Sequence, residues 1–442
     1  MQKKLFDYLP LSALQTFQLL RFVSTLGIGF LLAKVFGLST SEIAIYEILL
    51  FLSNFLSFFW IAGGIKALLS QYPREVYPFE FLLNITFLLF LFGCFAGGGL
   101  YTFQEIIVHY LTPFDNLEFV GLVSLILVFS APSSLVEYAY LLYKKDASII
   151  RYGFIIFGLQ ILSVLLPLSF GLGVAGIFQF MLGWSMFKFL WLIFLLYSLK
   201  RSVKKESYSC FNFKKLQKIG WLMFPLSLHT LIGGGMQYVD GFIVSSYFEE
   251  QGIFAIFRYG ARELPLVSIL VAALVATYIP KVVGDKKTSI VQMKKEVNKL
   301  AIWMFPLTYC LMLLSPLLFP IVYNADFSQS AHIFNIYLLI ISSRLLLPQV
   351  LIYAHQRNFI LVVSAIIEVI VNLILSLYLV KDYGLEGIAF ATVIAYLVNK
   401  VILIIFNYFQ LGVSLSTYIN LKTYVFCNLL LLLSWWVSRQ IY

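Results

Sequence analysis

The chain has 442 residues, of which 61% are hydrophobic and 12% charged, with a net charge of +10. Soluble domains are about 45–50% apolar and about 25% charged, so a water-soluble protein is excluded. Apolar runs of about 20 residues, each long enough to cross ~30 Å of hydrocarbon as a helix, recur from end to end. Alternating segments of ~10 residues, typical of membrane β-barrels, are absent. The composition predicts an all-α polytopic membrane protein.

The apolar runs predict twelve membrane spans. They lie at about 14–36, 43–68, 79–102, 118–142, 150–170, 172–198, 217–246, 252–280, 298–323, 332–354, 359–380 and 385–409. The first run lacks a small-residue cleavage site, so we expect an uncleaved span rather than a signal peptide. A thirteenth run, 424–438, either crosses the bilayer or lies at its interface, where Trp435 and Trp436 would suit the headgroups.

Lysine and arginine predict the orientation. With a cytoplasmic N-terminus, 22 of the 31 basic residues fall in the N-terminus and the even-numbered connections, and the odd-numbered connections hold only Lys381. This asymmetry follows the positive-inside rule. The net charge is therefore explained by topology and anionic lipid, and no nucleic-acid partner is expected.

An internal repeat predicts two like-oriented lobes. "FGLGVAGIFQF" (170–180) returns as "KDYGLEGIAFA" (381–391), and two shorter tracts return at nearly the same offset. The offset spans six helices, so both halves enter the membrane from the same side, as in transporters built from two parallel bundles. The predicted division is an N-lobe (1–199), a basic cytoplasmic linker (200–216), a C-lobe (217–410) and a C-terminal tail (411–442).

Charged residues inside the spans mark the candidate site, because each costs roughly 2.5–3.5 kcal/mol at the centre of a membrane helix. Lys34 lies near a span end, where its side chain can reach the interface. The other embedded bases are Arg21, Lys188, Arg258, Arg262, Arg344 and Lys400. We expect these six to line a hydrated cavity that receives an anionic group, because arginine grips phosphate with two parallel hydrogen bonds. The alternative is that they form structural pairs, for example Arg258 with Asp240.

The embedded acids are Asp240, Glu47, Glu137, Glu263 and Glu368. Asp240 could order the hairpin between the seventh and eighth spans, balance the arginines, or carry H⁺ or Na⁺ in a coupling step. Glu47, Glu263 and Glu368 are candidates for the same structural or coupling roles. The four cysteines and four histidines have no metal-type spacing, so no metal site and no other cofactor is expected.

Three stretches carry a family resemblance. Residues 31–73, 224–261 and 366–396 resemble hairpins of polysaccharide flippases in the multidrug/oligosaccharidyl-lipid/polysaccharide exporter (MOP) superfamily. Asn372 and the Gly384-x-x-Gly387 turn match the family pattern. The resemblance implies two six-helix lobes forming a V around a central cavity. It also implies transfer of an undecaprenyl-pyrophosphate-linked glycan to the outer leaflet of the bacterial inner membrane, beside other polysaccharide-assembly proteins.

Two departures favour the O-antigen or capsule (Wzx-like) branch, which serves lipopolysaccharide and capsule synthesis. The lipid II flippases of the superfamily have fourteen spans, and this chain has at most thirteen. Glu386 occupies a position that is usually small. A lipid II flippase and a drug/cation antiporter remain alternatives, although an antiporter should have more cavity acids than bases. An enzyme of the same pathway is disfavoured, because no outer connection is long enough for a catalytic domain.

Overall fold

The computed structural model describes residues 13–72, 75, 77–202, 213–355, 357 and 359–440. These residues form helices joined by short connections, and no strand occurs among them. The prediction of an all-α chain is confirmed. Most of the predicted basic linker (203–212) and the first twelve residues lie outside the described part.

The chain forms two compact units. Unit 1 comprises Met1–Gly234 and Glu249–Gln251, and unit 2 comprises Gly235–Phe248 and Gly252–Tyr442. The division falls inside the long helix α9 (Phe213–Tyr247), at the end of its Gly233–Gly235 run.

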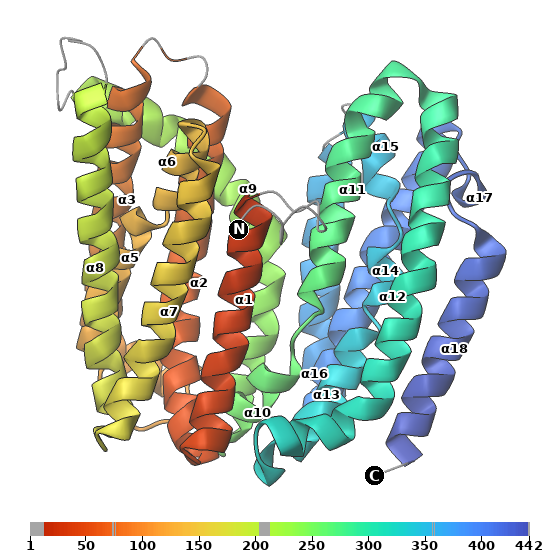
Figure 1. The fold of residues 1–442 in the computed structure, drawn as a ribbon. Helices are drawn as coiled ribbons and strands as arrows, with labels where there is room; N and C mark the ends of the chain where they lie inside the picture. Colours follow the sequence, from red (N-terminus) through yellow and green to blue (C-terminus); the bar gives the residue numbers. More distant parts are fainter. Residues whose placement is uncertain are drawn as a thin grey trace, which may run out of the picture. The chain divides into compact units, whose positions relative to one another are not determined.

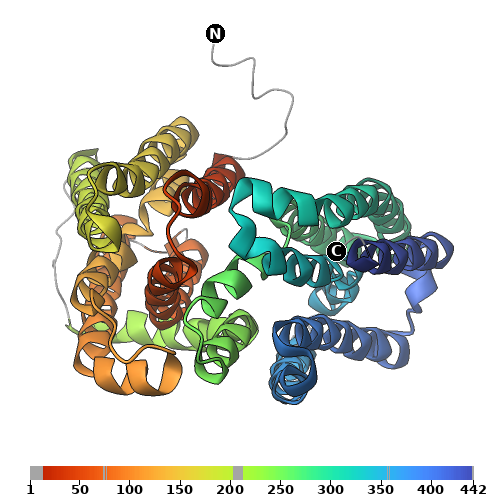
Figure 2. The same cartoon turned by 90° about the horizontal axis from the view of Figure 1, so that it is seen from below.

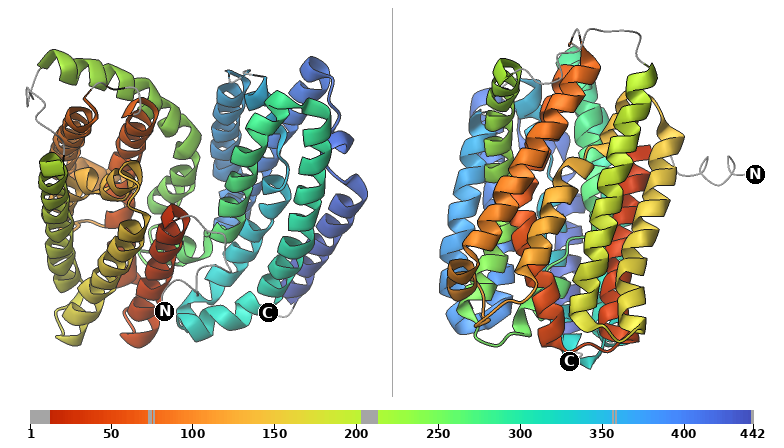
Figure 3. Two further views of the ribbon diagram at one scale, coloured as in Figure 1. Left: turned by 45° about the horizontal axis from the view of Figure 1, so that its top comes forward. Right: turned by 90° about the vertical axis from the view of Figure 1, so that its left-hand side faces the viewer.

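The helices of unit 1 precede α9 and run side by side (Figures 1 and 3). They are α1 (Ala13–Phe30), the π-helical η2 (Leu31–Val35), α2 (Thr40–Gln71), α3 (Pro78–Thr102), α4 (Gln104–Leu111), α5 (Val120–Ser133), α6 (Val136–Leu142), α7 (Asp146–Ser169) and α8 (Gly173–Ser202). Helix α5 packs against α3 and α8, and α7 packs against α1 and α8. Gly93 and Gly97 of α3 allow the backbone of α5 to approach closely, since an added Cβ at either would crowd Val128 or Ser124.

Unit 2 contains the helices that follow α9 (Figure 2). They are α10 (Ile253–Gly260), α11 (Pro265–Gly284), α12 (Lys286–Val322), the 3₁₀ turn η4 (Ala325–Phe327), α13 (Ser328–Leu338), α14 (Ile341–Arg344), α15 (Pro348–Ala354), α16 (Phe359–Leu411), α17 (Leu415–Tyr418) and α18 (Leu421–Gln440). Helix α13 packs against α10, α12 and α16, so it lies at the centre of the unit.

The apolar helices match most of the predicted spans, but the predicted seventh (217–246) and eighth (252–280) are not among the candidate crossings of the described residues. Nine helices of the described chain are long and apolar enough to cross a membrane, and a tenth crossing results if the bent pair Ala325–Arg344 and Pro348–Ala354 is one span. Helix α16 contains the predicted eleventh and twelfth spans. Gly384 has φ +55° and ψ −133°, and the side chains of Asn372 and Thr392 are joined by a hydrogen bond of 3.0 Å, so the helix is a hairpin with two arms.

The C-terminal helix α18 is among the candidate spans, so the thirteenth apolar run is long enough to cross. It packs against α12, where Tyr309 donates a hydrogen bond to the Cys427 carbonyl oxygen at 2.7 Å. Arg439 near its end lies 3.0 Å from Glu386 at the turn of α16. Glu386, which departs from the family pattern, therefore has a basic partner on α18.

Two predicted spans are broken. The predicted eighth span is divided into α10 and α11 by non-helical residues 261–264, and the tenth into α13, α14 and α15. Pro265 and Pro348 begin the helices after the breaks, where a proline needs no hydrogen bond from its nitrogen. In hydrocarbon, irregular backbone is tolerated only when protein or a wet cavity covers it.

The basic connection predicted around 281–299 is mostly helical. Helix α12 begins at Lys286, and Asp285 caps it by accepting a hydrogen bond from the Thr288 backbone N–H at 3.3 Å. Hydrogen bonds from the Thr288 side chain and backbone lower the pKa of the Asp285 carboxyl. The basic residues thus lie on a helical extension of the apolar segment.

The two G-x-x-G motifs of the sequence repeat adopt the same backbone conformation. Gly173 has φ +59° and Gly384 has φ +55°, a region that favours glycine. Gly387 also lies against the preceding arm, where an added Cβ would lie 2.6 Å from the Leu379 carbonyl carbon.

Replacing Gly387 by leucine should therefore open the α16 hairpin. We expect Gly387→Leu to lower the free energy of unfolding by about 3 kcal/mol, the upper range for overpacking. Thermal unfolding in detergent micelles measures the effect. Gly158→Leu is the control, because Gly158 is helical with nothing within 4 Å of an added Cβ. Equal stability of the two variants would contradict the close approach at Gly387.

Candidate functional site

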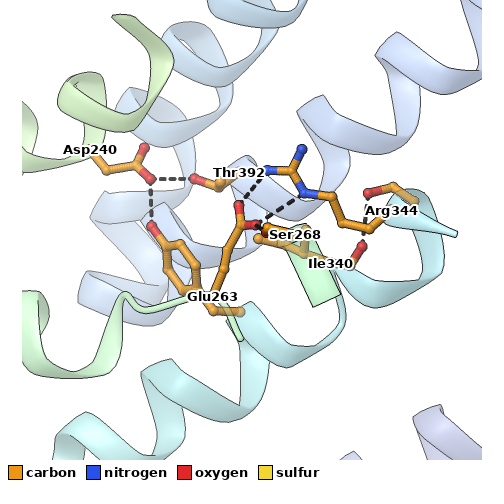
Figure 4. Close-up of polar contacts among 8 residues, drawn as sticks. Asp240, Glu263, Ser268, Ile340, Arg344 and Thr392 are labelled. Carbon is orange, nitrogen blue, oxygen red and sulfur yellow. Dashed lines mark hydrogen bonds and ion pairs between the residues drawn. The ribbon is translucent and has the colours of Figure 1, made fainter. Parts of the chain in front are cut away.

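Unit 2 holds a bidentate ion pair between two broken spans (Figure 4). Arg344, the last residue of α14, donates from Nε to Glu263 Oε2 at 3.0 Å and from Nη2 to Glu263 Oε1 at 2.7 Å. Glu263 lies in the break between α10 and α11. The two side chains are 29% and 26% exposed, so the pair is partly buried. Arg344 is thus neutralised by a carboxylate in this structure.

A second set of charges lies on α16, on both arms of the hairpin. Lys400 donates to Gln349 Oε1 at 3.0 Å and interacts electrostatically with Glu368 and Arg344. Tyr396 lies under Arg344, with 4.4 Å between the guanidinium carbon and the ring centroid. The side chains of Glu263, Glu368, Arg344 and Lys400 therefore form one network with no net charge.

In unit 1, Arg21, Glu137 and Lys188 form a network of two basic side chains and one acidic side chain. Arg21 Nη2 lies 3.0 Å from Glu137 Oε1, and Glu137 is buried while Arg21 is 48% exposed. Lys188 interacts electrostatically with both. Its ammonium donates to Ser130 Oγ at 3.5 Å and lies 3.6 Å from the centre of the Trp184 ring. The sequence placed Arg21 and Lys188 in one lobe. In the structure Arg21 contacts the Glu137 carboxylate, and Lys188 interacts with it electrostatically.

Arg258 and Arg262 lie near the end of α10. Arg262 Nε donates to the Arg258 carbonyl oxygen at 3.3 Å, and its guanidinium lies 4.8 Å from the centre of the Tyr259 ring. Glu47 is buried in α2, in unit 1. The structure therefore does not gather the six predicted cations into one group within a unit.

Asp240 is a buried carboxylate whose hydrogen bonds come from neutral donors (Figure 4). Tyr337 Oη donates to Oδ2 at 2.6 Å, Asn372 Nδ2 donates to Oδ1 at 3.1 Å, and the Thr392 hydroxyl also donates to Oδ2. These donors come from α13 and from both arms of α16. The structural alternative that paired Asp240 with Arg258 is thus replaced by three hydrogen bonds within unit 2.

Further oxygen atoms surround this aspartate on α16. The Thr392 hydroxyl lies within reach of a second acceptor, the Ile388 carbonyl oxygen at 3.3 Å. Asn372 Oδ1 and Ser376 Oγ are buried and have no hydrogen-bond partner among the described residues. Ser376 lies one helical turn after Asn372, on the same face. Several oxygen lone pairs are therefore available beside one buried negative charge, the kind of ligand set that a hard cation prefers.

The sequence missed Tyr337, Ser376 and Thr392 as parts of this site. Hydroxyl residues are common in membrane helices and cost little free energy there. The search for embedded charges therefore did not select them. The spacing of Asn372 and Ser376 was the available sign, because it places two polar groups on one face of an apolar helix. In the described residues, no group of three histidine, cysteine, aspartate or glutamate side chains could hold a metal ion.

The family model described as "Lipid II flippase MurJ" matches residues 147–442, more than half of the chain. A structure of lipid II flippase MurJ in an inward closed conformation is 18% identical, with a TM-score of 0.66, over 96% of this chain and 98% of that one. An inward-facing multidrug resistance MATE family transporter of the MOP superfamily is 12% identical, with a TM-score of 0.65, over 88% of this chain and 94% of that one.

A MOP superfamily transporter from Pyrococcus furiosus, described as having a binding pocket of reverse polarity, is also 12% identical. Its TM-score is 0.62, over 90% of this chain and 93% of that one. At these identities the structural likeness shows the fold, that of a multi-pass MOP superfamily protein. No curated protein matches the sequence.

The family match supports the lipid II alternative better than the O-antigen or capsule branch that we predicted. That prediction depended on the number of spans and on Glu386. The match includes both arms of α16, the broken spans and α18. The chain belongs to the family of the lipid II flippase MurJ.

Proposed function

We propose that this protein flips a polyprenyl-pyrophosphate-linked glycan of the lipid II type from the cytoplasmic to the outer leaflet. The family match over residues 147–442 carries this proposal. The protein acts as a transporter, and its charges bind and release the headgroup rather than catalyse a reaction. The positive-inside pattern supports a cytoplasmic N-terminus in a bacterial inner membrane.

The pyrophosphate needs cations that are not fully neutralised by the protein. Arg21 and Lys188 have one acidic side chain near them, Glu137, so their network has two basic groups and one acidic group. Arg21 is also half exposed and can reach a headgroup. We therefore assign the first contact with pyrophosphate to Arg21 and Lys188 of unit 1. Arg258 and Arg262 of unit 2 stay predicted contacts. Arg344 and Lys400 lie in a balanced network and would bind phosphate only after exchanging partners.

Asp240 is proposed as the site of the coupling ion, and Na⁺ fits it better than H⁺. A proton requires one oxygen, whereas this site combines the carboxylate with the oxygens of Asn372, Ser376 and Thr392. When the Thr392 hydroxyl donates to Ile388 instead of Asp240, its lone pairs become available to a cation. Because ligands shift a transport cycle only through different affinities for its states, Na⁺ must bind one state of unit 2 more tightly.

A substrate comparison tests the proposed function. Proteoliposomes would receive either fluorescent lipid II or an undecaprenyl-pyrophosphate-linked O-antigen sugar, and a membrane-impermeant quencher would report the leaflet. We expect flipping of lipid II that depends on the protein. Movement of the O-antigen lipid alone would favour the capsule branch, and movement of neither would overturn the proposal.

The unit 1 cations should be needed for flipping. Replacing Arg21 and Lys188 together by glutamine removes charge-assisted hydrogen bonds to phosphate, each worth about 1.5–3 kcal/mol, so we expect flipping to slow about tenfold or more. The proteoliposome rate is the measurement. Arg439→Gln is the matched control, because it removes a cation whose partner Glu386 only anchors α18. An unchanged rate in the double variant would remove both residues from the headgroup site.

The flipping rate should depend on Na⁺, and this dependence should be lost when the Asp240 carboxylate is removed. We expect wild-type flipping to rise with NaCl at constant ionic strength, with choline chloride as replacement. Asp240→Asn keeps the shape of the side chain and removes its charge, so the rate should no longer respond to Na⁺. A wild-type rate that follows pH but not Na⁺ would assign the coupling to protons, and a Na⁺ response retained in Asp240→Asn would exclude this site.

A further inference from the structure

We propose that Glu263 and Arg344 are a positioning pair for the ion site at Asp240, and that their bidentate contact determines how tightly and how selectively this site binds Na⁺. The inference depends on the proposed role of Asp240 as the ion site. Neither residue contacts the carboxylate in a hydrogen bond, so their effect is exerted through the donors Tyr337 and Thr392.

The pair joins two segments that are not held by helical hydrogen bonds. Glu263 lies in the non-helical break before Pro265, and Arg344 ends the short helix α14 before the break at Pro348. Their two parallel hydrogen bonds fix both the distance and the relative orientation of these segments. Without them, the breaks in the two spans would be constrained mainly by apolar packing, which is less directional.

The first connection to the ion site runs along α13 and α14. Tyr337 lies in α13, and Arg344 ends α14 seven residues later. Both line one small hollow, together with Glu263, Leu264 and Val267. The Tyr337 hydroxyl donates to Asp240 Oδ2 at 2.6 Å, so one side chain joins the hollow to the carboxylate. A shift of Arg344 would therefore move the backbone that leads to Tyr337 and change the hollow around its ring. Both changes would displace the Tyr337 hydroxyl.

The second connection runs along the second arm of α16. Thr392 and Tyr396 are four residues apart, one helical turn, and face the same side. Thr392 donates to Asp240, and Tyr396 carries the Arg344 guanidinium over its ring at 4.4 Å. Tyr396 also interacts electrostatically with Glu263. The ion pair thus contacts both segments that bring hydroxyl groups to Asp240.

Because the Glu263–Arg344 pair is connected to both Tyr337 and Thr392, it should affect the positions of the oxygen atoms around Asp240 as well as the charge nearby. Binding constellations work when their groups are held within about 0.5 Å of the required positions. Na⁺ and Li⁺ have the same charge and differ in size, so discrimination between them reports how firmly the oxygens are held. A general loss of stability would lower the unfolding temperature without changing this discrimination.

The experiment uses the purified full-length protein in detergent micelles. Stabilisation against thermal unfolding is measured against NaCl and against LiCl, with choline chloride holding the ionic strength constant, and gives the half-saturating concentration of each ion. We expect Glu263→Gln and Arg344→Lys each to raise the Na⁺ value about tenfold, equivalent to about 1.4 kcal/mol, and to reduce the preference between Na⁺ and Li⁺. Glu386→Gln, which breaks a different ion pair of unit 2, should leave both unchanged.

Arg344→Lys is the deciding variant. It keeps the charge near Asp240 but cannot form two parallel hydrogen bonds to Glu263. Wild-type affinity and ion preference in Arg344→Lys would overturn the positioning role, even if Glu263→Gln were impaired through its charge. If the wild type itself shows no stabilisation by either ion, or if Asp240→Asn responds as the wild type does, the proposed ion site fails and this inference fails with it. If ion binding requires Asp240 but is unchanged in Glu263→Gln and in Arg344→Lys, the positioning role is overturned and the ion site stands.

Discussion

A charge inside hydrocarbon must be met by another polar group, and this constraint organises both units. Each charge network found here solves it differently. Glu263 and Arg344 neutralise each other, Arg21 and Lys188 share a single carboxylate, and Asp240 is stabilised by neutral donors. The differences matter for transport, because a neutral network holds structure whereas an excess charge remains available to a ligand. We therefore infer the role of each embedded charge from the partners that surround it.

Breaks in the spans are the second consequence of the same physics. Irregular backbone at membrane depth exposes polar groups that must be covered, so it occurs where the protein supplies polar partners. In unit 2 the breaks at 261–264 and 345–347 lie beside the Glu263–Arg344 pair, and the hairpin of α16 carries the donors to Asp240. Transporters commonly place their sites at such discontinuous helices. The breaks in the backbone and the polar side chains therefore lie in the same part of unit 2.

The sequence predicted the features that depend on local patterns. Apolar runs gave the helices, and the G-x-x-G repeat gave two turns with the same left-handed glycine. Partners far apart in the chain were not predictable, because 81 residues separate Glu263 from Arg344 and 152 separate Asp240 from Thr392. Charge alone suggested Arg258 as the partner of Asp240, whereas uncharged donors take that place. From the sequence, Glu386 was a departure from the family pattern. In the structure it pairs with Arg439 of α18.

The central claim is that the positive charges of this membrane protein receive the pyrophosphate of a lipid-linked glycan. Native mass spectrometry of the protein extracted from bacterial membranes tests it most directly, because it identifies the bound lipid without choosing a substrate in advance. The account predicts a bound species with the mass of a polyprenyl pyrophosphate carrying a lipid II-type headgroup. A bound amphiphilic cation in its place would contradict the account and indicate a drug antiporter.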